Sequence, residues 1–514
     1  MTQDRQGNVP ALSPSPASSR ADGNAHTPPS LPEAIAPVVF MVALLASSVA
    51  IFGEDSSYGP NQIALLLSAG LAGLIGARRG FRWDELEEGI VQSISVALPA
   101  ALILLMVGAL IGAWILAGTV PYLIVLGATL LSPEWFYAAV CVISALVSLS
   151  IGSSWTTAGT IGVALMGSAQ AMDMSTTMTA GAVISGAYFG DKMSPLSDTT
   201  NLAAAVSRTN LFEHIHNMLW TALPAGIVAL TVFSFLGRAD VAADPAVFDA
   251  LEAELATEYH LGPVTLLPLA LLLFLSIRRY PPLPVVGLGA LAGVAVALVL
   301  QFDAAVALAP EGMTGWPAAL AGAWVALFDG YRTGSELPQM TDLLDRGGMS
   351  SMLNTIWLIL CAMVFGGVME RAGLLQRLVA GLLQLARGRA SLQLTTLGTG
   401  FTTNILAADQ YMAVAIPGRI YERAYVERGL HPLNLSRTLE DGGTLTSVLI
   451  PWNTCGAYMA ATLGVATFSY LPWCLFNLSS VAFSILWAVL GVGLVQGDGR
   501  RDGGPEPAGA PGRD

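Results

Sequence analysis

The sequence predicts an all-α polytopic membrane protein with two inverted repeats. Each repeat is expected to contain about five transmembrane helices and one re-entrant hairpin, with broken helices near the membrane midplane. Three observations predict this fold class: recurring apolar runs, similar segments in the two halves, and the distribution of arginine. The 514 residues are 54% hydrophobic and 11% charged, with a mean hydropathy of +0.62. Because soluble domains carry about 25% charged residues, this chain has too few charges to cover a water-facing surface of its size.

Long apolar runs define the main predicted spans. Several of them approach the ~20 residues that cross a bilayer as an α-helix. The runs cover residues 34–52, 63–77, 94–117, 135–151, 218–236, 264–277, 283–300, 353–369 and 471–495.

The ends of the chain differ from these runs in composition. Residues 1–32 and 497–514 are rich in Pro, Gly, Ala and Ser, which is typical of disordered segments. We therefore predict two disordered tails, a first membrane repeat at 33–236, an acidic external connector at 237–262 and a second membrane repeat at 263–496. The four cysteines lie in apolar segments without CxxC spacing, so the sequence predicts neither disulfides nor a zinc site, and we expect no cofactor.

Similar segments occur in the same order in the two halves. Residues 86–118 and 344–373 each begin with a charged pair and Gly, continue as an apolar span and end in Ala-Gly. SSWTTAGTIGVALMG in the first half resembles FTTNILAADQYMAVAIPG in the second. SPLSDTTN aligns with LIPWNTCG, which places Pro195 near Pro451. Repeated halves of this kind are typical of secondary transporters.

The positions of arginine orient the two halves. Cytoplasmic loops carry more Lys and Arg than external loops. With both termini in the cytoplasm, ARRGFR, IRRY, RIYERAYVER and GRRD fall on the inner side, and the acidic connector falls outside. This assignment makes residues 135–171 an outer-side hairpin and residues 392–417 an inner-side hairpin. It also gives an odd number of crossings per half, so the halves must be inverted relative to each other.

Four segments are unsuited to regular membrane helices. GDKMSPLSDTTN (190–201) is a predicted helix break, because Pro195 removes a backbone hydrogen bond and Ser, Asp, Thr and Asn compete for backbone groups. Its counterpart, EDGGTLTSVLIPWNTCG (440–456), contains paired glycines and a proline. The hairpin tips, IGSSWTT (151–157) and GTGFTTN (398–404), are rich in Gly and hydroxyls. Irregular backbone is tolerated at membrane depth where it lines a cavity. The four segments therefore predict one site of carbonyl, hydroxyl and carboxylate oxygens, which suits a hard cation or a proton.

Three of these stretches resemble the NhaC family of sodium/proton antiporters. They are GALIGAWILAGTVPYLIVLG, GSSWTTAGTIGVALMG and TAGAVISGAYFGDKMSPLSDTTNLA. The resemblance covers most of the chain between the tails and implies a bacterial inner-membrane ion exchanger rather than an enzyme. The family also contains members that exchange malate for lactate with protons and sodium. We expect the lipid bilayer and small ions as partners, with no nucleic acid, and a homodimer is compatible with this interpretation.

Carboxylates inside a membrane are expensive to bury and are usually functional. We predict that Na+ and H+ compete for Asp198 and Asp409. Asp198 has an alternative role, since it could cap a helix half, whereas Asp409 lies in an apolar hairpin arm with no evident turn to cap. The predicted ion- and proton-binding residues are Ser153, Ser154, Thr156, Thr157, Asp191, Lys192, Ser194, Asp198, Thr199, Thr200, Asn201, Thr403, Asn404, Asp409, Asn453 and Thr454.

Lys192 is the only lysine in the chain, and every other basic side chain apart from histidine is arginine. Lysine offers a compact ammonium that can lose its proton, whereas arginine stays charged. We hypothesise that Lys192 pairs with a site carboxylate until sodium displaces it. Asp191 is predicted either to be this partner or to be a ligand itself.

Other charged residues have less specific predictions. Glu440 and Asp441 adjoin an Arg-rich segment and could belong to the surface or to the site. Glu370 and Arg371 are expected to form a solvated pair at the membrane edge. Two histidines, His214 and His216, are expected at the membrane interface, with pH sensing as the alternative.

Three other functions remain open on sequence grounds. An organic-acid exchanger could use the same scaffold, although no arginine in the motif segments is available to hold a dicarboxylate. An intramembrane aspartyl protease would need the signature GxGD, but Tyr188 occupies the position of its first glycine. A channel would differ by lacking coupled, pH-dependent flux.

Overall fold

The computed structural model describes residues 27–53, 56, 58–239, 253–335 and 338–497. Most of the two predicted tails and part of the predicted connector lie outside this range. Within it, the regular structure is helical, apart from an isolated antiparallel bridge between Leu430 and Gln496.

Among the described residues, seven helices are long and apolar enough to cross a membrane, and an eighth span results if one bent pair is counted as a unit. Their number supports a multi-pass membrane protein, as the sequence predicted. The seven are α1 (Leu31–Phe52), α2 (Pro60–Arg78), α3 (Trp83–Leu116), α5 (Phe136–Ile151), α10 (Leu211–Ala239), α13 (Pro282–Leu300) and α17 (Leu353–Arg371), where α5 and α17 each continue a short 3-10 turn. The bent pair is α24 (Thr467–Tyr470) and α25 (Leu475–Leu490).

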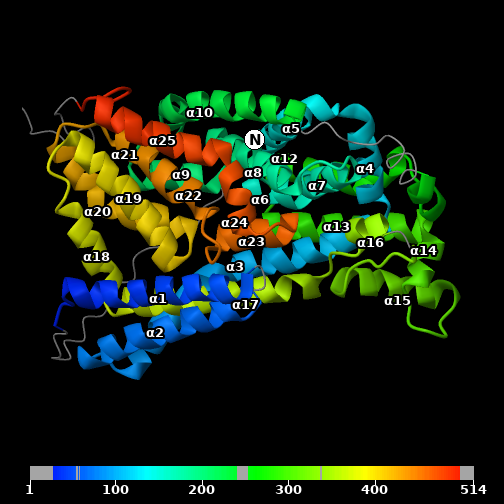
Figure 1. Cartoon of the computed structure of the whole chain (residues 1–514), viewed down its shortest axis with the longest axis horizontal. Helices are drawn as coiled ribbons and strands as arrows, with labels where there is room; N and C mark the ends of the chain where they lie inside the picture. The colour runs from blue at the N-terminus through cyan, green and yellow to red at the C-terminus, as the bar shows by residue number, and fades with distance from the viewer. Residues whose placement is uncertain (1–26, 54–55, 57, 240–252, 336–337, 498–514) are drawn as a thin grey trace, which may run out of the picture.

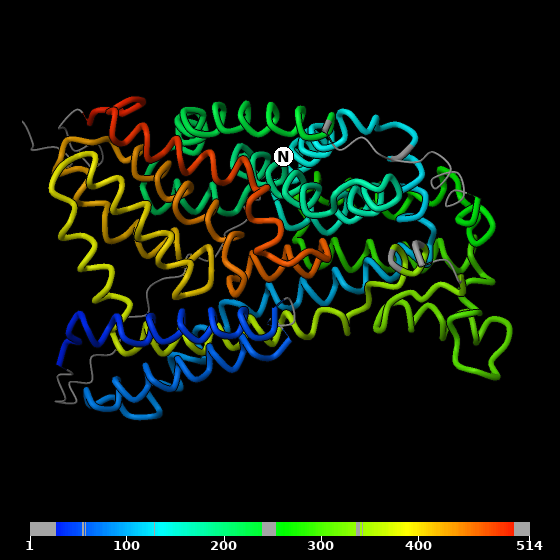
Figure 2. Tube along the Cα trace, in the orientation of Figure 1, coloured from blue at the N-terminus to red at the C-terminus, as the bar shows by residue number. Residues whose placement is uncertain are grey.

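The helices form two groups (Figures 1 and 2). In the first group, α3 packs along α17 and α13, and α2 packs against α1 and α17. Close approach of α3 and α17 depends on small residues, as is usual in membrane bundles. A Cβ atom added to Gly367 would lie 2.6 Å from the carbonyl oxygen of Gly89, so these two glycines allow the backbones to touch.

The second group contains two helical hairpins. The first joins α5 to α6 (Ser154–Thr157) and α7 (Val163–Ala171), and the second joins α19 (Arg389–Ala407) to α20 (Gln410–Glu427). Both tips have the same backbone shape. A left-handed residue, Gly152 with φ 77° or Ala408 with φ 54°, is followed by an extended residue that caps the next helix.

Two interrupted helices pack beside the hairpins. α8 (Thr176–Met193) is separated from α9 (Asp198–Val206) by residues 194–197. In the second half, α21 (Pro432–Leu439), a π-helical turn η6 (Glu440–Thr444) and α22 (Leu445–Ser447) are separated from α23 (Thr454–Leu463) by residues 448–453. This second helix begins at Pro432, about two turns earlier along the chain than the predicted broken segment at 440–456.

The segment between α13 and α17 contains several helices. It contains α14 (Phe302–Ala307) and an apolar helix, α15 (Gly315–Phe328), which packs against α3 and α14. A Cβ atom on Gly112 of α3 would lie 2.0 Å from the carbonyl oxygen of Ala326. The close glycine contact explains how a segment flanked by acidic residues still joins the helical core. Further helices are α4 (Thr119–Leu130), α12 (Leu267–Ile277), α16 (Pro338–Leu344) and α18 (Leu374–Leu383), and residues 253–258 are also helical.

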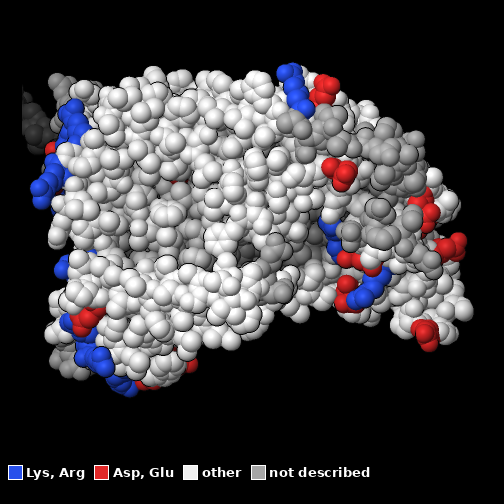
Figure 3. Space-filling view, viewed as in Figure 1, with Lys and Arg blue, Asp and Glu red and all other residues white. Residues whose placement is uncertain are grey.

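The surface has a wide uncharged belt between two charged ends (Figure 3). In this view one end carries mainly Lys and Arg, and the other carries mainly Asp and Glu. Large apolar side chains on the outer faces of the spans are exposed, including Leu67, Leu74 and Val299. An apolar belt of this kind is what a bilayer covers.

Candidate functional site

Both hairpin tips and both helix breaks meet at one cavity of about 360 Å³, here called the central cavity. Tyr458 of α23 links the two halves there, because its ring stacks on Trp155 and its hydroxyl donates to the Trp155 carbonyl oxygen at 2.8 Å. α3 and the start of α13 close the opposite side. Half of the predicted site residues line this cavity. They are Ser153, Ser154, Thr156, Asp191, Asp198, Thr199, Asp409 and Thr454.

Asp191 lies in the last turn of α8 and is almost fully buried. Its Oδ2 atom accepts hydrogen bonds from the backbone N–H of Ser154 at 3.1 Å and from the Ser154 hydroxyl at 2.7 Å. The carboxylate therefore sits at the N-terminus of α6, where free backbone N–H groups favour an anion. Of the two predicted roles, partner of Lys192 or member of the site, the geometry favours the second.

Asp409 is the N-cap residue of α20. Its Oδ1 atom accepts from the backbone N–H groups of Tyr411 at 2.9 Å and Met412 at 3.0 Å. The prediction that Asp409 has no turn to cap is wrong, because the hairpin reverses at Ala408, directly before it. Only one oxygen takes part in the cap, and Asp409 also lines the central cavity.

Asp198 is the first residue of α9, and the cap of this helix is Ser197. The Ser197 hydroxyl accepts from the backbone N–H of Thr200 at 3.4 Å. Asp198 is exposed and makes no hydrogen bond or ion pair with any described residue. Since capping is done by its neighbour, its carboxylate remains available to a ligand in the cavity.

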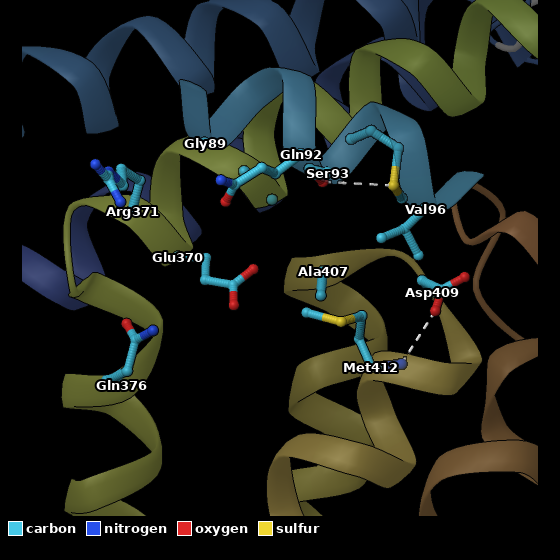
Figure 4. A pocket seen from close by; sticks show the side chains of 13 residues that line it. Gly89, Gln92, Ser93, Val96, Glu370, Arg371, Gln376, Ala407, Asp409 and Met412 are labelled. Carbon is cyan, nitrogen blue, oxygen red and sulfur yellow. Dashed lines mark hydrogen bonds between the residues drawn. The ribbon is translucent and has the colours of Figure 1, made fainter. Parts of the chain in front are cut away.

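Two further cavities adjoin the central one. One, of about 430 Å³, shares Val96 and Asp409 with it and extends to Glu370 and Gln376 (Figure 4). The other, of about 410 Å³, shares Gly152, Ser153, Thr156 and Asp198 and extends to Asn201 and Arg279. The central cavity is thus flanked by one cavity at each hairpin tip.

The predicted pair of Glu370 and Arg371 does not form. Arg371 instead bonds to Glu88 of α3 at 2.8 Å. Figure 4 shows the Glu370 carboxylate directed into the cavity between α17 and the second hairpin. Neighbouring positions on a helix point in different directions, which is why adjacent opposite charges did not pair.

Lys192 points away from the central cavity. Its Nζ atom donates to Asp441 of η6, to the Thr221 hydroxyl at 3.2 Å and to the Ser480 hydroxyl at 3.2 Å. Both members of the Lys192–Asp441 pair have fully buried side chains. A surface role for Asp441 is therefore excluded, and the predicted pairing of Lys192 with a cavity carboxylate is not what the structure shows.

The remaining predicted residues mostly hold the irregular backbone in place. The Ser194 hydroxyl donates to the Leu149 carbonyl oxygen at 2.9 Å, and the Asn453 side chain donates to Asn404 Oδ1 at 3.0 Å. Such bonds satisfy backbone and amide groups that a broken helix leaves free. Further bonds of this type are made by Thr157 to Ser153, by Thr200 to Lys192, by Asn201 to Ser197 and by Thr403 to Thr399.

Several cavity residues were not predicted. Gln410 and Tyr411 follow Asp409 at the second tip, and their polar character inside an apolar arm was a usable signal. Val96 and Pro99 of α3 have no such signal, because they look like any other part of an apolar span. Arg279, in the turn between α12 and α13, could be placed only by the tertiary structure.

The donor set consists of carboxylate, hydroxyl and carbonyl oxygens. Among the described residues, no group of three or more His, Cys, Asp or Glu side chains is arranged to hold a metal ion. The four cysteines are buried and unpaired. Oxygen ligands of this type suit Na+ or a proton rather than a transition metal.

Comparison with known proteins decides the family. Residues 186–492 match the sequence model of the Na+/H+ antiporter family. The chain belongs to the Na+/H+ antiporter family. An uncharacterised Na+/H+ antiporter of Haemophilus influenzae is 37% identical over 91% of this chain and 97% of that protein. The Na+/H+ antiporter NhaC of Alkalihalophilus pseudofirmus is 35% identical over 88% of this chain and 94% of its own length.

The family is not restricted to simple ion exchange. A malate-2H+/Na+-lactate antiporter of Bacillus subtilis is 34% identical, covering 84% of this chain and 90% of that protein. Family membership alone therefore does not determine whether an organic anion is transported together with the ions; the residues of the cavity determine this.

Proposed function

We propose that this protein exchanges Na+ for H+ across a bacterial cytoplasmic membrane, with Asp198 and Asp409 as the competing carboxylates. The observation that carries the proposal is the meeting of Asp191, Asp198 and Asp409 with tip hydroxyls in one central cavity. Asp198 has no partner among the described residues, and Asp409 uses one oxygen for capping. A protonated carboxylate loses its charge and its affinity for Na+, so the two ions exclude each other at the same oxygens.

The hydroxyls would complete the coordination of Na+. Ser153, Thr156, Thr199 and Thr454 line the same cavity and can replace part of the water shell of a hard cation. Binding at a partly enclosed site strengthens the attraction between the cation and the carboxylates, because the effective dielectric constant is lower than in water.

Alternating access would use the two flanking cavities. One contacts the central cavity at Asp409 and the other contacts it at Asp198. The two hairpins have matching tips, and each lies beside an interrupted helix, which supports an arrangement of inverted repeats. In this proposal the hairpin group moves against the group of α3, α13 and α17, and only the loaded forms cross.

Everted membrane vesicles provide the direct test. Addition of Na+ should release protons from acid-loaded vesicles that contain the protein, and equal concentrations of K+ or malate should not. Vesicles without the protein are the control. A response to malate alone, or equal responses to Na+ and K+, would contradict Na+/H+ exchange.

The charged ends predict the orientation. Arg208 and Arg423 lie at the Arg-rich end, where Arg208 pairs with Glu422. Glu254 lies at the opposite end, where it lines a cavity together with the acidic residues Glu258 and Asp303. Cysteine at 208 or 423 should react with an impermeant thiol reagent only from the cytoplasm, and cysteine at 254 only from outside. The native cysteines are buried, so their background should be low. Labelling of residue 254 from the cytoplasm would contradict the inverted arrangement. Residue 55, which is also expected outside, is not among the described residues.

One observation favours organic-acid exchange as a second candidate function. Arg279 lines the cavity that contains Asp198, and it forms no ion pair with any described residue. A guanidinium group holds a carboxylate by two parallel hydrogen bonds, so this arginine supplies the group that the motif segments lack.

Arg279→Gln separates the two functions. If the transported species is Na+ alone, the variant should exchange Na+ for H+ like the wild type. If an organic acid is carried, uptake of labelled malate should fall strongly in this variant. Arg278→Gln is a matched control, because the guanidinium of Arg278 lies over the ring of Phe274 and does not line the cavity. Equal malate uptake by both variants would remove Arg279 from substrate binding.

A further inference from the structure

A second group of buried charges lies outside the three cavities. It consists of Lys192, Glu440 and Asp441 and is here called the buried charge cluster. All three side chains are buried, and none of them lines the central cavity or its two neighbours. Two segments form it, the end of α8 and the π-helical turn η6, and hydroxyls from α10 and α25 complete it.

Within this cluster, Lys192 and Asp441 bond to each other and to the same two hydroxyls, those of Thr221 and Ser480. Asp441 Oδ1 accepts from Lys192, from Thr221 at 3.2 Å and from Ser480 at 2.9 Å. Lys192 has three donors, and its three acceptors are Asp441, Thr221 and Ser480. The ammonium group therefore has no donor left for another carboxylate.

Glu440 is the member without partners. Its side chain is fully buried, and neither carboxylate oxygen accepts a hydrogen bond from a described residue. An ionised carboxylate in such a place would cost several kcal/mol. Because Lys192 is committed to Asp441, the low-energy form of Glu440 in this conformation is the neutral acid, which carries a proton.

The backbone at Glu440 is also unusual. Glu440–Thr444 form a π-helical turn, and such turns occur often at functional sites. Asp441 Oδ2 and the Thr444 hydroxyl likewise have no partner among the described residues. Three polar side chains of this one turn, at positions 440, 441 and 444, thus have buried oxygens without a described hydrogen-bond partner, which is unusual for an apolar core.

Other titratable groups surround η6. α10 contributes His214, which is fully buried and whose ring nitrogens have no described partner. α21 contributes the buried Arg437, which donates to Asn217 Oδ1 at 3.3 Å and to the Gly493 carbonyl oxygen at 2.9 Å. α22 and α25 carry no titratable side chain, and Arg389 of α19 is exposed. Other titratable groups on neighbouring elements include Tyr188 and Asp191 of α8, Asp198 of α9, and Tyr421 and Tyr425 of α20, whose hydroxyls bond to Thr399 and Thr396. The other titratable side chains of α20 are the exposed Tyr411, Arg419, Arg423 and Glu427, and Glu422, which pairs with Arg208.

We propose that Glu440 is a proton-binding site of the transport cycle, separate from the carboxylates of the central cavity. Release breaks the O–H bond of the acid, leaves the electron pair on the carboxylate and passes the proton to water on the open side. The new charge then competes with Asp441 for Lys192. Asp191 directly precedes Lys192 in α8 and lines the central cavity. A shift of Lys192 therefore moves the backbone next to a residue of the proposed Na+ site.

This inference deepens the proposed function, and two assays on reconstituted protein test it. The first measures proton movement driven by a Na+ gradient. The second measures exchange of radiolabelled Na+ for Na+ without a gradient, which needs the cavity but no proton. Glu440→Gln should lose the first activity and retain the second. Glu427→Gln, the same substitution on an exposed carboxylate of α20, should retain both.

The possible results differ clearly. Proton movement at the wild-type rate in Glu440→Gln would overturn the proposal. Loss of both activities in folded protein would also overturn it, because Glu440 would then belong to the Na+ site. If Glu440→Gln does not fold, Glu440→Asp decides: a displaced pH profile of exchange supports proton binding, and an unchanged profile contradicts it.

If the wild type shows no Na+-driven proton movement, the proposed function fails. The same variants are then compared in proton-driven malate uptake. Loss of uptake in Glu440→Gln supports the proposal, and uptake at the wild-type rate overturns it.

Discussion

Asp198→Asn is expected to abolish both Na+-driven proton movement and Na+/Na+ exchange, while the protein still inserts in the membrane. Asparagine has nearly the same shape as aspartate but neither binds a proton at neutral pH nor carries the charge that attracts Na+. Asp198 is exposed to the cavities and has no described hydrogen bond to lose. Its removal should therefore change the stability by less than about 0.5 kcal/mol, as for other substitutions away from buried contacts.

The measurement is exchange in vesicles with equal amounts of inserted protein. Asp84→Asn is a suitable control, because Asp84 forms an exposed pair with Arg82, far along α3 from the cavity, and such pairs contribute little. Wild-type exchange by Asp198→Asn would remove Asp198 from the ion site. Loss of activity together with loss of inserted protein would indicate a structural role instead.

Lys192→Met is expected to give the largest loss of stability. It leaves the Asp441 carboxylate buried without a counter-charge, and breaking a buried ion pair from one side costs about 3–5 kcal/mol. Removing the second charge as well, in Lys192→Met/Asp441→Asn, should recover much of this loss. Thermal unfolding in detergent tests this: the unfolding temperature should be highest for the wild type, lower for the double variant and lowest for the single variant. Equal unfolding temperatures for the wild type and the single variant would contradict a charged pair.

Lys192→Arg tests whether charge alone is enough at this position. Arginine keeps the positive charge but must fit a larger, planar group between Asp441, Thr221 and Ser480. We expect exchange to fall nearly as much as in Lys192→Ala, with a lower apparent affinity for Na+. The half-maximal Na+ concentration across a pH series measures this. An arginine variant that matches the wild type at every pH would show that only the charge matters.

Local sequence determined the class of the protein and much of its outline. Apolar runs without charges predict membrane helices wherever they occur, because the cost of burying charge in a bilayer does not depend on the neighbours in the fold. The tip at Gly152 and the break at Pro195 were also predictable. Glycine, proline and short polar side chains act on the backbone within a few residues. The second tip was placed wrongly, because GTGFTTN (398–404) is part of α19 and the chain reverses at Ala408.

Local sequence also located the site, although it assigned some roles wrongly. It placed Asp191, Asp198 and Asp409 among the candidates, and all three line one cavity. It did not show that Ser197 rather than Asp198 caps α9, since either residue type can cap and one residue of register decides between them. For the same reason, the sequence did not show that the chain turns at Ala408, directly before Asp409.

Tertiary structure alone decided which charges meet. Lys192 is next to Asp191 in sequence, yet its ammonium bonds to Asp441, 249 residues away, because consecutive helical residues point to different neighbours. Arg279 reaches the cavity of Asp198 only through the packing of the α12–α13 turn beside the first hairpin. Burial of Glu440 without a partner likewise depends on α19, α20 and α25 closing around η6. A charge in a membrane protein takes its state from the groups that surround it in space, and those groups come from all parts of the chain.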